Sequence, residues 1–309
     1  MKDTLGFLGL GQMGRPIAAN LLKAGYALRA YDRDSHARSL FVRDHPQVEM
    51  VKSVGETIEA GGIVVSMVPD DQALRELVFR PDGILARLGP GGMHLSLSTV
   101  SSDLAEVLAL LYEEHGCTYL SATVIGRPDV AAAGKQTIFL SGDPEAKERA
   151  MPILSTLGTV VDVGSAIAAA NVAKLATNSL ILAAIAAMGE AADLIERHGG
   201  DASSIFATVA ASPLFGSGAV YTGYGQMIGR KDFHPALFPV ALGLKDARLI
   251  LQAAQHVGLE MPSTRRASHA LLAAVGAGRS AEDWSVLAAY SSRDAQAATT
   301  HCGTRKGNS

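Results

Sequence analysis

The sequence has only two cysteines in 309 residues, which limits the chemistry that thiols can provide. Cys117 and Cys302 lie far apart in the chain, and neither belongs to a short Cys or His spacing of the kind that binds a metal ion. We therefore expect no metal site. The scarcity of cysteine is also typical of a reduced protein, so we expect a cytoplasmic location.

An excess of charge of one sign is also missing. The formal net charge is −3 at pH 7 and the pI is about 6.3, so no basic field indicates binding to nucleic acid or to an anionic membrane. Near the N-terminus, Lys2 and Asp3 lead directly into a glycine-rich stretch, without the apolar core and small-residue cleavage site of a signal peptide. The expected partner is therefore a small-molecule substrate, with no nucleic acid and no membrane.

Even the most hydrophobic stretch, residues 166–198, is not one unbroken apolar run. It lacks proline and is rich in Ala, Leu and Ile, which predicts a single long helix. Lys174 interrupts it, and the apolar run between Asn178 and Glu190 is shorter than the ~20 residues that a membrane span needs. We therefore expect this helix to be buried within folded protein.

The polar residues of this long helix fall on one face. At 100° per residue, Asn171, Lys174 and Asn178 lie within an arc of about 60°. A lysine flanked by two amides on an apolar helix is a candidate site, and the alternative is an amphipathic lysine that reaches solvent. Gly189 lies on the same face further along, where it is expected to let a neighbouring helix pack closely.

A glycine motif, GxGxxG at residues 9–14, follows a short apolar run at 5–8 and precedes a helical pattern. This is where a dinucleotide-binding motif should lie, between a strand and a helix. Gly9 permits the tight turn, Gly11 lets a pyrophosphate approach the backbone, and Gly14 lets the helix pack on the sheet. Free amides at the helix start then face the phosphates.

The second predicted strand, residues 27–31, ends at Asp32, where a carboxylate can accept from the adenosine ribose hydroxyls. The alternative for Asp32 is a solvated turn residue. An aspartate at this position favours NAD because it repels a 2′-phosphate, whereas Arg33 could pair with that phosphate. The cofactor is therefore NAD or NADP, with NAD slightly favoured.

Further strand signals appear at residues 62–67, 93–97, 118–124, 136–140 and 158–163, with helical patterns between them. Val68-Pro69 and Ser98-Thr99 follow two of these strands, at the edge of a parallel sheet where ligands bind, although Thr99 could be only a turn or cap residue. Arg127 lies in a turn-rich loop after another strand. It could receive a substrate carboxylate or form a surface ion pair.

After residue 164 the pattern contains only helices, which we expect at 202–211, 219–227, 238–256, 265–275 and 281–289. The predicted fold is an α/β Rossmann-type domain over residues 1–163, followed by an all-α domain over 164–298 and a polar tail over 299–309. The long helix joins the two domains. His94 lies inside a predicted strand, where core packing is the better explanation, and no Ser-His-Asp order supports a hydrolase.

Several motifs together resemble one known family. These are GFLGLGQMGRPIAANLLKAGY at the start, the Val68-Pro69 strand end, the Ser98-Thr99 turn, NVAKLATN in the long helix, and Lys245-Asp246. On these motifs the chain resembles the β-hydroxyacid dehydrogenases over nearly its full length. This family includes 3-hydroxyisobutyrate dehydrogenase, tartronate semialdehyde reductase and the related imine reductases, within the 6-phosphogluconate dehydrogenase superfamily.

The resemblance implies roles for individual residues. Lys174 matches the catalytic acid/base of the family, and Asn178 matches the asparagine that positions substrate. Thr99 and Lys245 match residues that lie against the cofactor. The family is generally dimeric or tetrameric with interlocking helical domains, which implies a homodimer or homotetramer.

The sequence departs from the family in its substrate loop. Residues 121–127 read SATVIGR, where the family usually has DAPVSGG. Ile125 therefore replaces a hydroxyl that normally binds substrate, and Arg127 stands where a second glycine is common. Residues 168–170 are alanines, where glycines are usual before the asparagine of the catalytic helix. A substrate lined by Ile125 would gain an apolar contact and lose a hydrogen bond, which weakens the case for the usual small hydroxy acids.

The sequence thus predicts an NAD(P)-dependent oxidoreductase that transfers hydride between the cofactor and a small carbonyl compound or β-hydroxy acid, with Lys174 as general acid/base. The alternatives are an NADPH-dependent imine reductase, although imine reductases more often carry Asp or Tyr at the lysine position, and a non-catalytic NADP-binding scaffold. The predicted catalytic residues are Lys174 and Asn178, the substrate-binding residues Asn171, Ile125, Gly126 and Arg127, and the cofactor-binding residues Gly9, Gly11, Gln12, Met13, Gly14, Asp32, Arg33, Met67, Val68, Pro69, Thr99 and Lys245.

Overall fold

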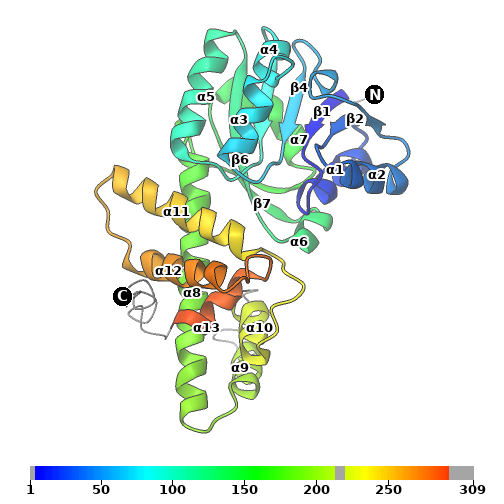
Figure 1. Cartoon of the computed structure of the whole chain (residues 1–309). Coiled ribbons are helices and arrows are strands. Elements are labelled where there is room, and N and C mark those ends of the chain that lie inside the picture. Colours follow the sequence, from blue (N-terminus) through cyan, green and yellow to red (C-terminus); the bar gives the residue numbers. More distant parts are fainter. Residues whose placement is uncertain (1–3, 213–219, 292–309) are drawn as a thin grey trace, which may run out of the picture. The chain divides into compact units, whose positions relative to one another are not determined.

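The computed structural model describes residues 4–212 and 220–291, and the chain divides into two compact units, Met1–Leu175 and Ala176–Ser309. The first unit contains one eight-stranded sheet with the order β3-β2-β1-β4-β5-β6-β7-β8 (Figure 1). Its strands are β1 (Thr4–Leu8), β2 (Ala27–Tyr31), β3 (Glu49–Met50), β4 (Ile63–Ser66), β5 (Met93–Ser96), β6 (Thr118–Ile125), β7 (Gln136–Ser141) and β8 (Gly158–Asp162). The predicted α/β Rossmann-type class is confirmed.

Two strands, β7 and β8, run opposite to the other six, because β7 pairs antiparallel with β6 and parallel with β8. The pairs from β3 through β6 are parallel, but β6 and β7 pair antiparallel with Ser121 opposite Ser141. The pattern of strands and helices in the sequence did not indicate this reversal. The cause is the length of the β6–β7 connection, residues 126–135, because a parallel return needs a crossover of about a dozen residues or more. Within this connection, the short helix α6 (Pro128–Ala132) begins in the predicted loop, directly after Arg127.

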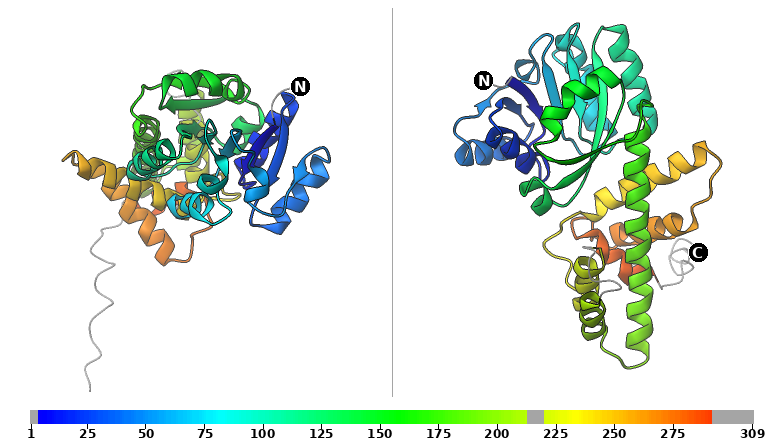
Figure 2. Two further views of the ribbon diagram at one scale, coloured as in Figure 1. Left: turned by 90° about the horizontal axis from the view of Figure 1, so that it is seen from above. Right: turned by 180° about the vertical axis from the view of Figure 1, so that it is seen from behind.

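Helices cover both faces of the sheet, because both side-chain rows of its central strands are apolar. In β1, Leu5 and Phe7 join one core and Leu8 joins the other. The first core is closed by α1 (Gly14–Lys23), α2 (Ser35–Asp44), α6 and α7 (Pro144–Leu154), which Figure 2 shows from behind. The second is closed by α3 (Asp71–Phe79), α4 (Ile84–Leu88) and α5 (Ser102–Glu114), beside the short turn η1 (Gly55–Thr57).

Four of these helices begin with a side-chain cap. Asp34, Asp70, Ser101 and Asp143 each accept a hydrogen bond from a backbone N–H in the first turn of α2, α3, α5 and α7 respectively. Helices α1, α4 and α6 have no side-chain cap, and the N-cap residue of α1 is Met13. The backbone N–H groups at the start of α1 are thus left for another partner.

The described residues of the second unit form helices joined by loops, as predicted. Its helices after α8 (Ala169–Arg197), which spans the division between the units, are α9 (Ala202–Ala211), the π-helical turn η2 (Val220–Tyr224), α10 (Gly225–Arg230), α11 (Val240–His256), α12 (Pro262–Gly276), the 3₁₀ turn η3 (Trp284–Leu287) and α13 (Ala288–Ser291). The helix predicted at 219–227 begins outside the described residues and changes type at Gly225. The helix predicted at 281–289 is a 3₁₀ turn capped by Asp283 and then α13.

Close packing of α8 in this unit depends on Gly189. A Cβ atom at this position would lie 2.5 Å from the Cα atom of Ala288 in α13, which is far closer than two carbon atoms can approach. The expectation that Gly189 lets a neighbouring helix pack closely is therefore confirmed. The nearby Trp284 ring packs edge-on against Phe238, with 4.7 Å between ring centroids.

Helix α8 is long and apolar enough to cross a membrane by length and composition, and among the described residues it is the only such helix. Its most apolar window has a mean hydropathy of 1.6, but 44% of that window is buried within the protein. Core helices of globular proteins meet the same criteria. Length and composition of α8 are therefore weak evidence for a membrane span.

The observed division of the chain lies within α8, between Leu175 and Ala176. The sequence-based boundary, between residues 163 and 164, instead marks the end of the sheet. The difference arises because the first turns of α8 are bonded to the sheet: Thr123 and Ser141 both hydrogen-bond to the backbone of Ala170. The start of the helix thus belongs structurally to the first unit.

Candidate active site

The three glycines of the GxGxxG turn have different surroundings. A Cβ atom on Gly9, whose φ is 100°, would lie 2.2 Å from the carbonyl oxygen of Met67, and one on Gly14 would lie 1.9 Å from the carbonyl oxygen of Gly9. Both glycines are therefore required by packing within the protein. A Cβ atom on Gly11 would meet no atom within 4 Å. The open face of the turn is at Gly11, where a ligand can approach the backbone.

The start of α1 adds backbone donors to this open face. No side chain caps the helix, and its first turn contains no acidic residue that would repel an anion. The exposed residues Gly11 and Gln12 lead into it through Met13. Unpaired N–H groups and the positive end of the helix dipole favour a negative charge there. These residues fit the pyrophosphate of a dinucleotide cofactor.

Asp32 lies at the end of β2 and holds the glycine turn. Its Oδ2 atom accepts a 2.6 Å hydrogen bond from the backbone N–H of Leu10, and its Oδ1 atom accepts a 2.8 Å bond from Asp34. A carboxylate has about four lone pairs, so these bonds leave acceptor capacity for ribose hydroxyls. Arg33 has a 79% exposed side chain and a long 4.0 Å ion pair with Glu76.

The ends of β4 and β5 are tied together beside this turn. The backbone N–H of Val68 donates a 2.9 Å hydrogen bond to Ser98 Oγ, and the side chain of Asp71 accepts from both the backbone N–H and the hydroxyl of Ser101. The loop that carries Thr99 is thus fixed on both sides. Met67, Val68 and Thr99 are partly exposed at the carboxyl edge of the sheet, and Pro69 is exposed there.

Two residues that support this edge were not predicted as part of the site, namely Ser98 and Asp71. Ser98 was visible only as part of the Ser98-Thr99 turn, and no motif in the sequence singled out Asp71. Their partners are 30 residues away in the sequence. No local pattern identifies such long-range pairs.

The substrate loop begins where β6 ends. Ile125 and Gly126 are partly buried, and a Cβ atom on Gly126, whose φ is 155°, would lie 3.2 Å from the side chain of Val130. Arg127 contacts Asp129 through two hydrogen bonds of 3.3 and 3.1 Å, which lower the pKa of the Asp129 carboxyl. The ion pair that the sequence allowed is present, so any substrate carboxylate that binds Arg127 shares it with Asp129.

Asn171 connects the start of α8 to the end of β5. Its Nδ2 atom donates a 3.2 Å hydrogen bond to the carbonyl oxygen of Val100, the residue after Thr99. Its amide oxygen is buried and accepts no hydrogen bond from the residues that the structure describes. Lys174 is partly buried one turn further along the same face of α8. The helix face that carries Lys174 therefore lies beside the carboxyl end of β5.

In the second unit, Asn178 and Lys245 converge on a buried carboxylate. Asp246 is 1% exposed, and its Oδ2 atom accepts a 2.5 Å hydrogen bond from Asn178 Nδ2. Its Oδ1 atom lies 2.7 Å from Lys245 Nζ. Asp246 was not predicted as a site residue. The feature that could have identified it is a charged residue at a position of α11 that faces the core, next to the buried Ala247.

His94 lies outside this arrangement, as expected from its place in a strand. Its ring nitrogens lie 2.8 Å from the Tyr112 hydroxyl and 2.8 Å from Ser66 Oγ. Complete burial lowers the pKa of His94 to about 3, so the ring is neutral at physiological pH. Among residues 4–212 and 220–291, no group of His, Cys, Asp and Glu side chains is arranged to hold a metal ion.

Comparison with known proteins agrees with this geometry. The family model described as "NAD binding domain of 6-phosphogluconate dehydrogenase" matches residues 4–167, and the one described as "NAD-binding of NADP-dependent 3-hydroxyisobutyrate dehydrogenase" matches residues 168–291. The chain belongs to the β-hydroxyacid dehydrogenase family. As a member of this family it is an NAD(P)-dependent oxidoreductase that acts on CH–OH groups.

Relatives and a solved structure support the same assignment. An uncharacterized oxidoreductase of Bacillus subtilis is 36% identical over 91% of this chain and 96% of its own length. The NAD-dependent L-serine dehydrogenase of Pseudomonas aeruginosa is 32% identical over 81% of this chain and 85% of its own. A structure of 3-hydroxyisobutyrate dehydrogenase from Mycobacterium tuberculosis with L-serine has a TM-score of 0.80 and 28% identity, and covers 94% of this chain and 99% of its own.

Proposed function

We propose that this β-hydroxyacid dehydrogenase interconverts a small β-hydroxy acid and the corresponding carbonyl compound, with Lys174 as the general acid/base. The observation that carries the proposal is the hydrogen bond from Asn171 to the carbonyl of Val100. It holds the Lys174 face of α8 beside the carboxyl end of β5. Ligands of open α/β sheets bind at this edge.

The nicotinamide cofactor supplies or accepts the hydride when it is bound. In the oxidation direction, Lys174 as a neutral amine removes the proton from the substrate hydroxyl. In the reduction direction, Lys174 as an ammonium group gives a proton to the oxygen of the carbonyl. The buried amide oxygen of Asn171, which lacks a partner among the described residues, is an acceptor for a donor group of a bound ligand.

Asn178 orients the substrate in this proposal, and Asp246 fixes its orientation. A carboxylate only accepts hydrogen bonds, so the NH₂ group of Asn178 must face Asp246. The amide oxygen then faces away from Asp246. Lys245 is held by the same carboxylate, and by family resemblance it contacts the cofactor.

The residues at the glycine turn favour NAD over NADP. The carboxylate of Asp32 is held at the end of β2 by the backbone N–H groups of Leu10 and Asp34, where it repels a 2′-phosphate. Arg33 is the residue that could offset this repulsion. We expect fluorescence titration to show tighter binding of NADH than of NADPH. Arg33→Ala should weaken the binding of NADPH and leave the binding of NADH unchanged. Tighter binding of NADPH by the wild-type protein would contradict the preference.

The substrate class follows from Arg127 and Ile125 at the end of β6. A guanidinium group suits a carboxylate, and the isoleucine side chain suits an apolar carbon next to it. The names of two relatives, one for L-serine and one for 3-hydroxyisobutyrate, agree with small carboxylates.

The experiment is a turnover panel with L-serine, 3-hydroxyisobutyrate and L-threonate with NAD⁺ and NADP⁺, and a cyclic imine with NADPH. We expect the highest kcat/KM for one of the hydroxy acids. Higher kcat/KM for the cyclic imine would favour the imine reductase alternative, and cofactor binding without any turnover would favour the scaffold.

We also propose a cytoplasmic homodimer or homotetramer assembled through α8. Leu180 and Leu194 are 72% and 61% exposed, and they lie on one face of α8 together with the exposed Val172. A second copy of the chain would bury this face. Light scattering after gel filtration should show that Leu180→Glu lowers the assembly mass, whereas Leu110→Glu, at a 63% exposed position of α5, leaves it unchanged. Equal masses for both variants would exclude this interface.

A further inference from the structure

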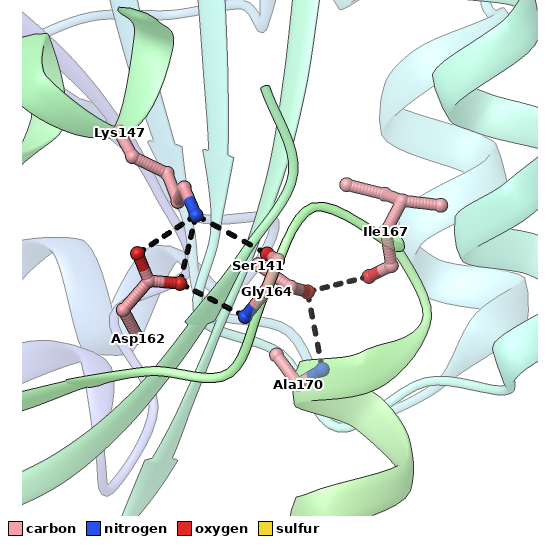
Figure 3. Close-up of polar contacts among 6 residues, drawn as sticks. All are labelled: Ser141, Lys147, Asp162, Gly164, Ile167 and Ala170. Carbon is pink, nitrogen blue, oxygen red and sulfur yellow. Dashed lines mark hydrogen bonds and ion pairs between the residues drawn. The ribbon is translucent and has the colours of Figure 1, made fainter. Parts of the chain in front are cut away.

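Two buried hydroxyl groups of the sheet bind the first turn of α8. Ser141 Oγ donates a 2.7 Å hydrogen bond to the carbonyl oxygen of Ile167 and accepts a 3.1 Å bond from the backbone N–H of Ala170 (Figure 3). Thr123 Oγ1 donates a 2.8 Å bond to the carbonyl oxygen of Ala170. The Ala170 residue is therefore held through both its N–H and its C=O group.

The origin of these hydroxyls distinguishes α8 from its neighbours. Helices α2, α3, α5 and α7 are capped by the residue that precedes each of them, which fixes only the local chain. At the start of α8, the N–H of Ala170 is instead satisfied by Ser141 of β7, 29 residues earlier. A cap supplied by a strand fixes where the helix begins relative to the sheet.

The two hydroxyls come from one face of neighbouring strands. Ser141 pairs directly with Ser121 in the antiparallel β6–β7 register, and Thr123 is two residues further along β6, so its side chain points to the same face. The unexpected antiparallel direction of β7 is what places Ser141, the last residue of that strand, opposite this part of β6.

The segment that leads into α8 is also fixed. Lys147 is 8% exposed, and its Nζ atom lies 2.7 and 2.8 Å from the two carboxylate oxygens of Asp162 and 3.2 Å from the carbonyl oxygen of Gly164 (Figure 3). Asp162 Oδ1 also accepts a 2.9 Å bond from the backbone N–H of Gly164. The segment between β8 and α8 is thus anchored at Asp162 and Gly164, just before the residues that contact Ser141.

We propose that Thr123 and Ser141 are positioning residues for Lys174. This inference rests on the proposed role of Lys174 as general acid/base. Ala170 lies four residues before Lys174, so in an α-helix its carbonyl belongs to the turn on which the lysine stands. Thr123 binds this carbonyl directly. Release of the first turn moves Lys174 away from the reacting oxygen, and a displacement of about 1 Å costs about 10²-fold in rate.

The experiment removes each hydroxyl at nearly constant shape, with Thr123→Val and Ser141→Ala alone and combined. The matched control is Thr57→Val, because Thr57 is 2% exposed and its hydroxyl donates a 2.6 Å bond to the carbonyl of Val54, away from α8. We expect kcat of the double variant to fall about 10- to 100-fold, while the Kd for NADH and the Tm change no more than in the control.

Thr123→Ser is the rescue variant, because it keeps the hydroxyl and loses only a methyl group. The proposal requires its kcat to be close to that of the wild type. If Thr123→Ser and Thr123→Val lose kcat equally, the side chain acts through packing and the proposal is wrong. If Ser141→Ala does not fold, Thr123→Val and Thr123→Ser still decide the question.

A double-mutant cycle with Lys174→Ala separates this inference from the proposed function. If the hydroxyls act through the lysine, Thr123→Val has no further effect on the residual turnover of Lys174→Ala. A further loss of similar size would show an effect independent of Lys174 and overturn the inference. If Lys174→Ala itself keeps near-normal turnover, the proposed function fails first. If Lys174 is essential but both hydroxyl variants have normal kcat, only the positioning role fails.

Discussion

The side-chain amide of Asn178 in α8 donates a 2.5 Å hydrogen bond to the buried carboxylate of Asp246 in α11. The same carboxylate lies 2.7 Å from the ammonium group of Lys245. Two residues with expected roles toward substrate and cofactor thus depend on a third residue that contacts neither in the proposed arrangement. This buried carboxylate is costly to remove, because the buried amide of Asn178 then loses its acceptor.

Asp246→Leu should therefore affect both stability and turnover. We expect the free energy of unfolding in urea to fall by about 2 kcal/mol, since a hydrogen bond to a charged group contributes about that much. We also expect kcat to fall by about tenfold, because Asn178 loses its fixed orientation. Glu260→Gln is the control, because Glu260 pairs with Arg265 at 79% side-chain exposure and such surface pairs contribute little. An equal loss in both variants would contradict the role of Asp246.

Substitution by alanine should affect cofactor binding at Gly11 and stability at Gly14. Gly11→Ala places a methyl group in open space, so we expect normal stability and NADH binding weakened by about tenfold or more, because the backbone is closed to the pyrophosphate. Gly14→Ala drives the methyl group toward a carbonyl oxygen 1.9 Å away, so it should lower the Tm even without cofactor. Thermal unfolding with and without NADH measures both effects. Normal NADH binding by Gly11→Ala would place the cofactor elsewhere.

Stability should fall in mild acid because of His94. Burial lowers the pKa of His94 from 6.5 to about 3, so between these pH values the unfolded chain binds a proton that the folded chain does not. This contribution to stability is complete above pH 6.5 and is lost as the pH falls, by about 2 kcal/mol between pH 6.5 and 5. Urea unfolding at pH 7 and pH 5 should show a smaller difference for His94→Gln than for the wild type. Parallel losses in the two proteins would mean that another group is responsible.

The sequence predicts those parts of the structure that depend on neighbouring residues. The glycine turn, the strand ending at Asp32 and the long helix with Lys174 all follow from short motifs and helical periodicity. Gly189 was predicted to permit close packing because it shares a helix face with Asn178. Its partner, Ala288, could not be predicted, because it lies about a hundred residues away and the spacing of α8 says nothing about which element covers it.

The contacts that hold the site are between residues distant in sequence. Thr123 and Ala170 are 47 residues apart, and Asn178 and Asp246 are 68 apart. A threonine in a β-strand and an aspartate in an amphipathic helix are compatible with many surroundings, so their patterns do not identify a partner. Local sequence patterns also do not predict the antiparallel direction of β7. This direction follows from the length of the β6–β7 connection and from which strand is next in the sheet.

The central claim is that Lys174 transfers the proton, and it is tested most directly by single-turnover kinetics of Lys174→Met with a saturating nicotinamide cofactor and the best substrate of the panel. This substitution keeps an unbranched side chain of similar shape, one atom shorter, and removes the amine. We predict that the rate of NADH formation or consumption falls by about 10²- to 10⁴-fold, the usual contribution of general acid–base catalysis. The Kd for NADH should stay within about twofold of the wild type. A single-turnover rate within tenfold of the wild type, or a loss of NADH binding as large as the loss of rate, would contradict the account.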